Sequence, residues 1–143
     1  MLDEYTVKLP IRPRFCDTDM LGHVNNAVYL SYFEAGRMQW WTEVSGDPSL
    51  EDLPFILARA EVDFVAEARA GEPLVLGLRC AKLGNKSFDI EYELVREADG
   101  SPVARGRSVQ VMFDYRRRET RRIPDDVRRR IERLEAARPR PTR

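Results

Sequence analysis

The sequence predicts an α+β fold in which an antiparallel five-stranded sheet wraps one long central helix and a short helix ends the chain. Residues 26–44 carry apolar side chains at helical spacing. Residues 54–115 form four segments in which apolar and polar side chains alternate, and turn sequences separate these segments. Residues 123–143 predict a short helix, because acidic residues come first and arginines follow, which is the order that the helix dipole favours. Successive strands joined by short turns favour an antiparallel sheet, and a long apolar helix needs such a sheet to cover it.

The composition indicates one globular domain. The chain has 143 residues, 43% hydrophobic and 34% charged, which suits a single domain with its own core over residues 1–143. It has no apolar run of the length that a membrane helix needs, and its first 15 residues lack the apolar stretch of a secretory signal. Cys16 and Cys80 form no CxxC pair, so we expect a cytoplasmic protein with reduced thiols, with a disulfide as the alternative.

Charge is distributed unevenly along the chain, although the formal net charge is zero. Residues 116–143 contain 12 Arg and five acidic residues, so residues 1–115 are acidic. This Arg-rich segment is interpreted either as the solvated face of a helix or as a surface for an anion or another subunit. The acidic character of the rest argues against a nucleic-acid-binding domain.

The first strand and the long helix are separated by a polar loop. The segment "YTVKLPIRPRFCDTD" is rich in β-branched and aromatic residues but contains Pro10 and Pro13, which predicts an edge strand. The helix is expected from Asn26 to Val44, with Asn25 or Asn26 as its N-cap. Its apolar stripe includes residues at spacings of three and four: Leu30, Phe33, Arg37, Trp40, Trp41 and Val44.

Four strands follow in "PFILARAEVDFVAEARA", "LVLGLRCAKLG", "SFDIEYELV" and "VARGRSVQVMFDY". The third alternates most regularly, with one face formed by Phe88, Ile90, Tyr92 and Leu94 and the other by Asp89, Glu91 and Glu93. The last helix begins at Pro124 and has Asp125 and Asp126 in its first turn. Five strands curled around one helix are the hotdog architecture. An exposed edge strand is commonly paired by a second copy, so we expect a dimer at least.

The stretch "CDTDMLGHVNN" carries the groups with chemical potential. Asp17 is interpreted as a turn or cap partner. Asp19 lies beside Met20 and Leu21, and partial desolvation would make its carboxylate a better base or nucleophile. The free N–H groups of the helix start can stabilise an oxyanion. A carboxylate beside such an N-terminus is what thioester hydrolysis requires.

His23 is the only histidine of the chain and follows Asp19 by four residues. It either orients Asp19 or a water molecule, or it is an ordinary structural hydrogen-bonding group. With one His and no ligands at metal-binding spacing, we expect no metal site and no cofactor.

The stretch "RFCDTDMLGHVNNAVYLSYFEAGR" resembles the signature of the 4-hydroxybenzoyl-CoA thioesterase-like acyl-CoA thioesterases of the hotdog superfamily. The segments "GNKSFDIEYEL" and "VQVMFDYRRRETRRIPDDVRRRI" are similar to later parts of that family, so the resemblance covers roughly residues 7–135. It implies a hydrolase that releases free acid and CoA from an acyl thioester. The "GHVNN" loop is similar to that of enzymes acting on fatty-acyl chains, which disfavours a benzoyl substrate. The pattern D-x-N-x-H of related plant carrier-protein enzymes is not met, because Leu21 takes its middle position.

The resemblance also implies residue roles. Asp19 would be the catalytic carboxylate, the backbone N–H of Asn26 the oxyanion contact, and His23 a supporting group. The candidate contacts to substrate or CoA are Asn25, Tyr29, Lys86 and Ser87, with packing at Tyr29 and an ordinary turn at residues 86–87 as alternatives. Tyr29 and Glu34 match family positions that serve mainly in packing and in anchoring the helix. Four aromatic residues either line an acyl pocket or pack in the core: Phe33, Trp40, Trp41 and Phe55.

The leading hypothesis is therefore an acyl-CoA thioesterase, with acyl-carrier protein as the alternative carrier and a dimer or tetramer as its assembly. A hotdog protein that binds acyl-CoA or acyl-carrier protein without turnover is the alternative from another class. Hydratase chemistry on an enoyl thioester shares the fold, but its G-D-x-N-P-x-H pattern fits "TDMLGH" poorly.

Overall fold

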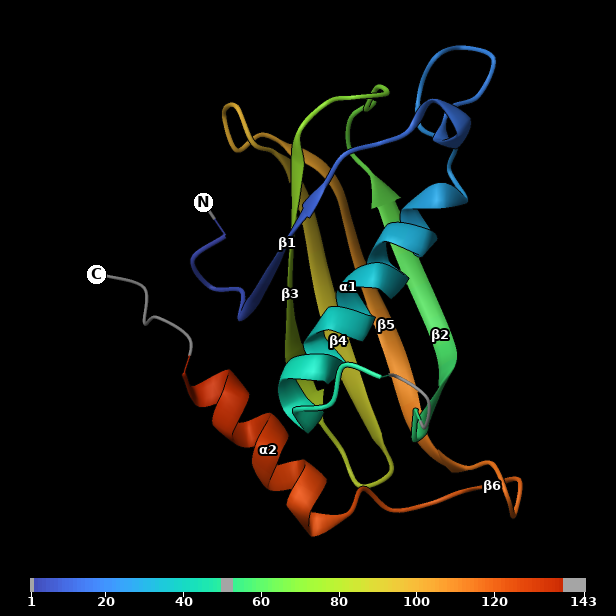
Figure 1. Cartoon of the computed structure of the whole chain (residues 1–143), viewed down its shortest axis with the longest axis vertical. Coiled ribbons are helices and arrows are strands. Elements are labelled where there is room, and N and C mark those ends of the chain that lie inside the picture. The colour runs from blue at the N-terminus through green and yellow to red at the C-terminus, as the bar shows by residue number, and fades with distance from the viewer. Residues whose placement is uncertain (1, 50–52, 138–143) are drawn as a thin grey trace.

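The computed structural model describes residues 2–49 and 53–137 (Figure 1). Its elements follow the predicted order of strand, long helix, four strands and short helix. It adds a 3₁₀ turn, η1, before the long helix and a short strand, β6, before the last helix. The elements are β1 (Val7–Ile11), η1 (Phe15–Asp17), α1 (Val28–Ser45), β2 (Phe55–Phe64), β3 (Leu74–Leu83), β4 (Ser87–Arg96), β5 (Pro102–Asp114), β6 (Glu119–Thr120) and α2 (Asp125–Ala136).

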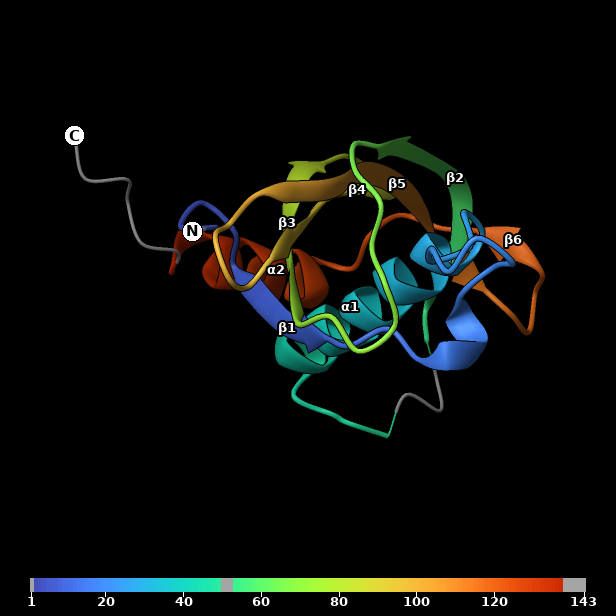
Figure 2. The ribbon, with the colours of Figure 1, turned by 90° about the horizontal axis from the view of Figure 1, so that it is seen from above.

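The strands form one antiparallel sheet in the order β1-β3-β4-β5-β2, and β6 pairs with β5. The sheet arches over α1, which lies on its concave side (Figure 2). The predicted α+β hotdog fold is thus confirmed. β1 lies at an edge, as its prolines predicted, and β2 forms the opposite edge.

The core lies between α1 and the concave face of the sheet. The side chains of β4 that were predicted to share one face are all buried: Phe88, Ile90, Tyr92 and Leu94. A Cβ at Gly36 would lie 2.7 Å from Leu76 Cδ2, so glycine lets α1 approach β3 closely. The Phe33 ring stacks on Tyr92 at 4.4 Å between centroids and lies against Gly106, where a side chain would clash with it.

Two sequence predictions about α1 need correction. α1 begins at Val28 rather than Asn26, because the chain at residues 25–28 forms a turn in which Val28 N–H donates to Asn25 O at 2.9 Å. Leu30 is 43% exposed, because none of the described elements covers that side of α1. On β4, Asp89 belongs to the opposite face from Phe88 and Ile90, as predicted, and it is buried there with its charge paired to Arg107.

One carboxylate of α2 makes several of the contacts that dock this helix across the end of α1. Glu135 Oε1 accepts hydrogen bonds from Trp40 Nε1 at 3.1 Å and from the Cys80 N–H at 2.9 Å. Glu135 Oε2 accepts one from Thr6 Oγ1 at 2.6 Å. The carboxylate therefore joins α2 to α1, β3 and the segment before β1, while Ile131 is buried beneath the helix.

We expect Glu135→Ala to lower the free energy of unfolding by about 1–3 kcal/mol, because it leaves the N–H groups of Trp40 and Cys80 without their partner. Urea unfolding followed by tryptophan fluorescence measures the change. Glu132→Ala, at an exposed position of α2, is the matched control and should shift the midpoint little. Equal shifts of the urea midpoint for Glu135→Ala and Glu132→Ala would contradict this role of the Glu135 carboxylate.

Candidate active site

η1 and a short hairpin lead into α1 (Figure 1), with Asp17 at the end of η1 and Asp19 in the hairpin. Thr18 pairs with Val24 as an isolated β-bridge. On one side of that bridge Asp19 N–H donates to His23 O at 2.8 Å, and on the other Asn25 N–H donates to Asp17 O at 2.8 Å. The hairpin therefore brings Asp19, His23 and the start of α1 together.

Asp17 is buried and its carboxylate is fully engaged. It accepts hydrogen bonds from the Arg14 N–H at 2.9 Å, from the Arg14 guanidinium at 3.0 Å and from Tyr32 OH at 2.9 Å. Burial raises the pKa of Asp17, but these hydrogen bonds and the charge of Arg14 outweigh it and hold the pKa below its usual range. Asp17 therefore ties the hairpin to α1 as an anion, which agrees with its interpretation as a structural residue.

Asp19 has an exposed side chain, and so do Met20 and Leu21 beside it, so the partial desolvation expected from these neighbours is not found among the described residues. Its Oδ1 accepts the N–H of Leu21 at 2.8 Å and, more weakly, that of His23 at 3.3 Å. Among the described residues its Oδ2 has no hydrogen-bond partner. One oxygen thus orients the carboxylate within the turn, and the other is available to a ligand or a water molecule.

The His23 side chain turns away from Asp19. Its Nε2 lies 2.8 Å from Glu67 Oε2, and its backbone pairs with Arg69 as an isolated β-bridge. The histidine therefore fastens the hairpin to the segment between β2 and β3. In this arrangement it supports Asp19 through the shape of the loop, since the loop brings only its backbone N–H to the carboxylate.

The start of α1 offers a free donor next to this turn. Asn25 Oδ1 accepts the Ala27 N–H at 3.0 Å, and Asn25 O accepts the Val28 N–H at 2.9 Å. Within the part of the chain that the structure describes, the backbone N–H of Asn26 has no partner. Asn25 therefore shapes the turn with its side chain, and Asn26 leaves one amide proton available.

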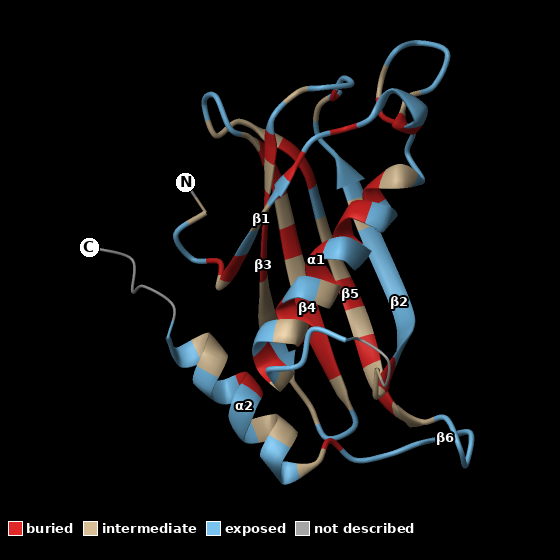
Figure 3. Ribbon diagram, in the orientation of Figure 1, coloured by how far each residue is buried: buried red, intermediate tan, exposed pale blue. Residues whose placement is uncertain are grey.

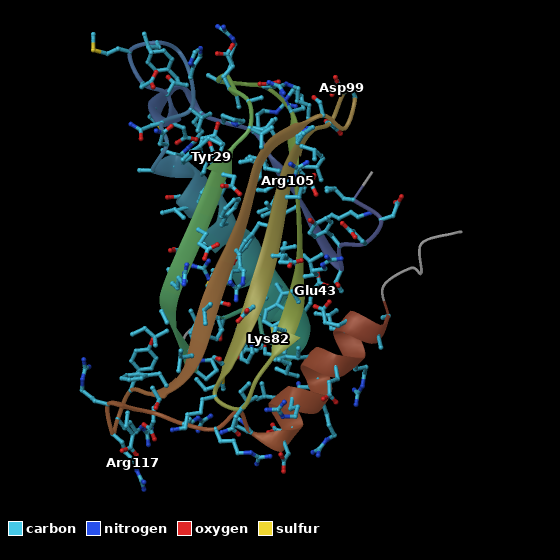
Figure 4. The ribbon with its side chains drawn as sticks, turned by 180° about the vertical axis from the view of Figure 1, so that it is seen from behind. Tyr29, Glu43, Lys82, Asp99, Arg105 and Arg117 are labelled. Atoms are coloured by element: carbon cyan, nitrogen blue, oxygen red, sulfur yellow. The ribbon has the colours of Figure 1, made fainter. Side chains whose placement is uncertain are left out.

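Tyr29 follows on the first turn of α1 and is buried against Tyr32 and Phe64, with centroid distances of 6.1 and 5.4 Å. Burial and the charge of Glu72 raise its pKa, so the phenol stays neutral at physiological pH. Figure 4 shows Tyr29 at one end of the sheet and Arg117 of the Arg-rich segment at the other.

Two predicted CoA contacts do not join this cluster within one chain. Lys86 and Ser87 lie at the turn between β3 and β4, beside the segment that leads into α2, where Ile123 N–H donates to Asn85 O at 2.9 Å. Figure 1 places that turn at the opposite end of the sheet from the hairpin with Asp19. The length of β4, 10 residues, separates the two ends by about 30 Å.

Most of the aromatic candidates for an acyl pocket belong to the core. Trp40 stacks on Phe88 at 5.3 Å, and Trp41 packs edge-on against Phe55 at 5.3 Å. Phe33, by contrast, borders an open space, a cavity of about 120 Å³ between α1 and the strands β2 and β5. The cavity is lined by Leu30, Ser31, Phe33, Glu34, Arg37, Leu57, Ala60 and Ser108.

Sequence reasoning missed this cavity and the charged residue inside it. Arg37 was placed in the apolar stripe of the helix, and it is indeed 6% exposed. An arginine at an inward position of an otherwise apolar helical stripe was the available signal. Glu34, expected to anchor the helix, is instead exposed at the rim of the cavity.

The residues 2–49 and 53–137 contain no group of three or more His, Cys, Asp or Glu side chains that could hold a metal ion. Nor does any helix among them combine the length and apolarity needed to cross a membrane.

The two cysteines are free and differ in environment. Burial and the nearby charge of Glu135 raise the pKa of Cys80 to about 12, so its thiol stays protonated, whereas Cys16 is exposed. We expect Ellman's reagent to modify Cys16 rapidly in the native protein and Cys80 only after denaturation. Cys16→Ser should remove the rapid phase, and a rapid phase that survives this change would contradict the prediction.

The family model of the thioesterase-like superfamily matches residues 13–131. The chain belongs to this superfamily. The predicted relationship to hotdog-fold thioesterases is thereby confirmed, and the matched region contains the hairpin, α1 and the whole sheet except β1.

Solved structures agree with this assignment. A thioesterase from Thermus thermophilus, complexed with coenzyme A and Zn, is 34% identical with a TM-score of 0.85, over 97% of this chain and 98% of that one. A predicted thioesterase from Bacillus stearothermophilus is 31% identical with a TM-score of 0.81, over 89% of this chain and 94% of that one.

Two curated relatives match less of their own length. YsmA of Bacillus subtilis is 26% identical over 68% of this chain and 66% of its own. The chloroplastic acyl-acyl carrier protein thioesterase ATL2 of Arabidopsis thaliana is 23% identical over 85% of this chain and 65% of its own. The chain thus spans just under two-thirds of each.

Proposed function

We propose that this protein hydrolyses acyl-CoA thioesters, with Asp19 as the nucleophile or general base and the Asn26 N–H as the oxyanion contact. The observation that carries the proposal is the pairing, on one hairpin, of a carboxylate oxygen and a backbone N–H that both lack partners among the described residues. The family membership of the chain supports the reaction class.

The chemistry divides between these two groups. Asp19 Oδ2 either attacks the thioester carbonyl carbon or removes a proton from an attacking water molecule. In both cases the carbonyl oxygen gains negative charge in the transition state. A donor N–H beside the positive end of the α1 dipole stabilises that charge, and the thiolate of CoA then leaves.

Coenzyme A is the carrier that we propose. The Thermus thermophilus thioesterase, 34% identical over nearly the whole chain, was crystallised with coenzyme A, and this supports CoA over a carrier protein. The Arabidopsis relative acts on acyl-carrier protein but matches over only 65% of its own length. His23 takes part by holding the Asp19 turn against Glu67.

We further propose that a second copy pairs along the free edge of β2. This strand has 10 residues, no proline and, among the described strands, only one neighbour, β5; Figure 3 shows it almost wholly exposed. A long unpaired edge beside apolar side chains is a ready site for pairing. Apart from Tyr115, the exposed large apolar residues of the described chain lie on η1, the hairpin, the start of α1, and β2 and its end: Phe15, Met20, Leu21, Leu30, Ile56, Leu57, Phe64 and Val65.

Such a dimer would also account for the position of Lys86 and Ser87. Antiparallel pairing of β2 with its own copy reverses the second sheet, so the end of the partner's sheet with Lys86 comes alongside this chain's Asp19. Each site would then combine the hairpin of one protomer with the β3–β4 turn of the other, where a CoA moiety could be held.

The test is thiol release from a panel of acyl-CoA esters, compared between the wild-type protein and Asp19→Asn. Turnover by the wild type that the substitution removes is the expected result. If the wild type binds acyl-CoA but releases no thiol from any ester, the protein is a binding protein and the proposal is wrong.

A further inference from the structure

The cavity between α1 and β2 contains a buried positive charge that none of the described residues neutralises. Arg37 is 6% exposed and lines the cavity of about 120 Å³. Within residues 2–49 and 53–137 its guanidinium has one hydrogen-bond partner, the neutral Tyr92 OH at 3.1 Å from Nη1. A guanidinium carries five N–H donors, and a buried one that lacks an anion is costly to the fold.

The groups behind Arg37 extend this polar patch. Tyr92 OH and Ser108 Oγ share a hydrogen bond of 2.6 Å, and Gln110 Nε2 donates to the same Ser108 oxygen. Tyr92 oxygen accepts from Arg37, and either hydroxyl can donate the bond between Tyr92 and Ser108; when Tyr92 donates it, the Ser108 proton is free for the cavity that it lines. Gln110 is completely buried, and its Oε1 has no partner in the described part of the chain.

The position of the cavity relates it to the reacting centre. Leu30 and Ser31, at one end of the cavity, belong to the first turn of α1, shortly after Asn26. Arg37 lies seven residues beyond Leu30, about 10 Å along the helix axis. An acyl chain that enters beside Asn26 would thus pass the apolar Leu30 and Leu57 before its far end reaches the guanidinium.

We propose that Arg37 binds a carboxylate at the far end of the acyl group, so that the preferred substrates are CoA monothioesters of dicarboxylic acids. The inference rests on the proposed thioesterase function and names the substrate class of that site. An anion satisfies the charge of Arg37 and its free donors, which a plain alkyl chain cannot do. Of the described residues that line the cavity, Glu34 carries the one other charge, and its side chain is exposed at the rim, where solvent screens it.

The experiment compares adipoyl-CoA with hexanoyl-CoA, which have the same chain length and differ in the terminal carboxylate. We expect the wild type to favour adipoyl-CoA by about 10- to 100-fold in kcat/KM, because a hydrogen bond to a charged group typically contributes a binding free energy that corresponds to this ratio. Arg37→Met should abolish this preference through a higher KM for adipoyl-CoA, and Arg37→Lys should restore part of it. Gln39→Met, on the exposed face of α1, is the control and should leave the preference intact.

A binding measurement separates this inference from the thioesterase proposal. Calorimetric titration of the two esters into Asp19→Asn, with and without Arg37→Met, requires no turnover. Tighter binding of adipoyl-CoA that depends on Arg37 supports the inference even if no ester is hydrolysed. Equal binding of both esters overturns it, and so does a wild-type preference for hexanoyl-CoA.

The competing role for Arg37 is an ion pair with a second copy of the chain. In that case Arg37→Met would shift the protein from dimer to monomer in light scattering and lower the hydrolysis of both esters alike, which overturns the substrate role. Melting temperatures of the variants show whether each is folded. If Arg37→Met fails to fold, Arg37→Lys and Ser108→Ala replace it in the test. Each should reduce the preference for adipoyl-CoA over hexanoyl-CoA without lowering the hydrolysis of hexanoyl-CoA.

Discussion

Asp19→Asn is expected to lower kcat for acyl-CoA hydrolysis by about 10³-fold or more, while the dissociation constant of the substrate changes only a few-fold. The carboxamide can neither attack the thioester nor accept a proton from water. Its oxygen can still accept the N–H groups of Leu21 and His23, so the turn keeps its shape. Thiol release under saturating substrate and calorimetric binding measure the two quantities separately.

Asp17→Asn is the matched control for this prediction, because the two aspartates lie two residues apart in the chain. The substitution removes the anion that Arg14 and Tyr32 hold, so we expect it to lower stability by about 1–3 kcal/mol rather than abolish turnover. The folded-state pKa of Asp17 is depressed, so its stabilisation is present above the ordinary aspartate pKa of about 3.9 and is lost as the pH falls below it. Should Asp17→Asn abolish turnover while Asp19→Asn retains it, the two roles would be reversed.

Placing charges at both ends of β2 is expected to dissociate the proposed dimer into monomers and to lower activity by about 100-fold. In an isologous antiparallel pair, Ile56 of one copy faces the end of β2 that carries the partner's Phe64. The double substitution Ile56→Arg and Phe64→Arg therefore places charges in the apolar surface at both ends of the pairing edge, with Ile56 on the convex face of the sheet and Phe64 on the concave face beside Tyr29. Neither residue lines the cavity with Arg37, but Phe64 packs against Tyr29, so Ile56→Arg alone is the variant whose activity reports on dissociation.

Light scattering coupled to gel filtration measures the first effect, as a fall to the chain mass of 16.6 kDa. Ala81→Arg, at an exposed position of β3 away from the β2 edge, is the control and should remain dimeric and active. A double variant that stays dimeric with full activity would place the interface elsewhere.

Much of the fold could be predicted from the sequence because it depends on local periodicity. The alternation in β4 identified the buried side chains Phe88, Ile90, Tyr92 and Leu94, and Pro10 indicated that β1 lies at an edge. The start of α1 was predicted two residues early, since two consecutive asparagines suit a cap and a turn equally well. Only the turn hydrogen bonds of Asn25 separate the two possibilities.

The candidate site was predictable as a stretch of sequence but not as a set of contacts. The spacing of Asp17 and Asp19 left open whether they share one environment. The structure places one carboxylate against Tyr32 and leaves the other exposed. The sequence left open whether His23 orients Asp19 or a water molecule or makes an ordinary structural hydrogen bond, and in the structure its side chain contacts Glu67, 44 positions along the chain.

By itself, the sequence determined the order of the main elements, the long helix and the polar loop that carries Asp19, because each follows from neighbours within a few residues. Only the tertiary structure decided which oxygen of Asp19 has no hydrogen-bond partner among the described residues. It also decided that Lys86 lies at the opposite end of the sheet from Asp19, and that Arg37 is buried without an anionic partner among the described residues. These properties depend on distances between residues far apart in the chain. Sequence periodicity predicts which face of a helix or strand a side chain lies on, but only the tertiary structure shows which groups it contacts there.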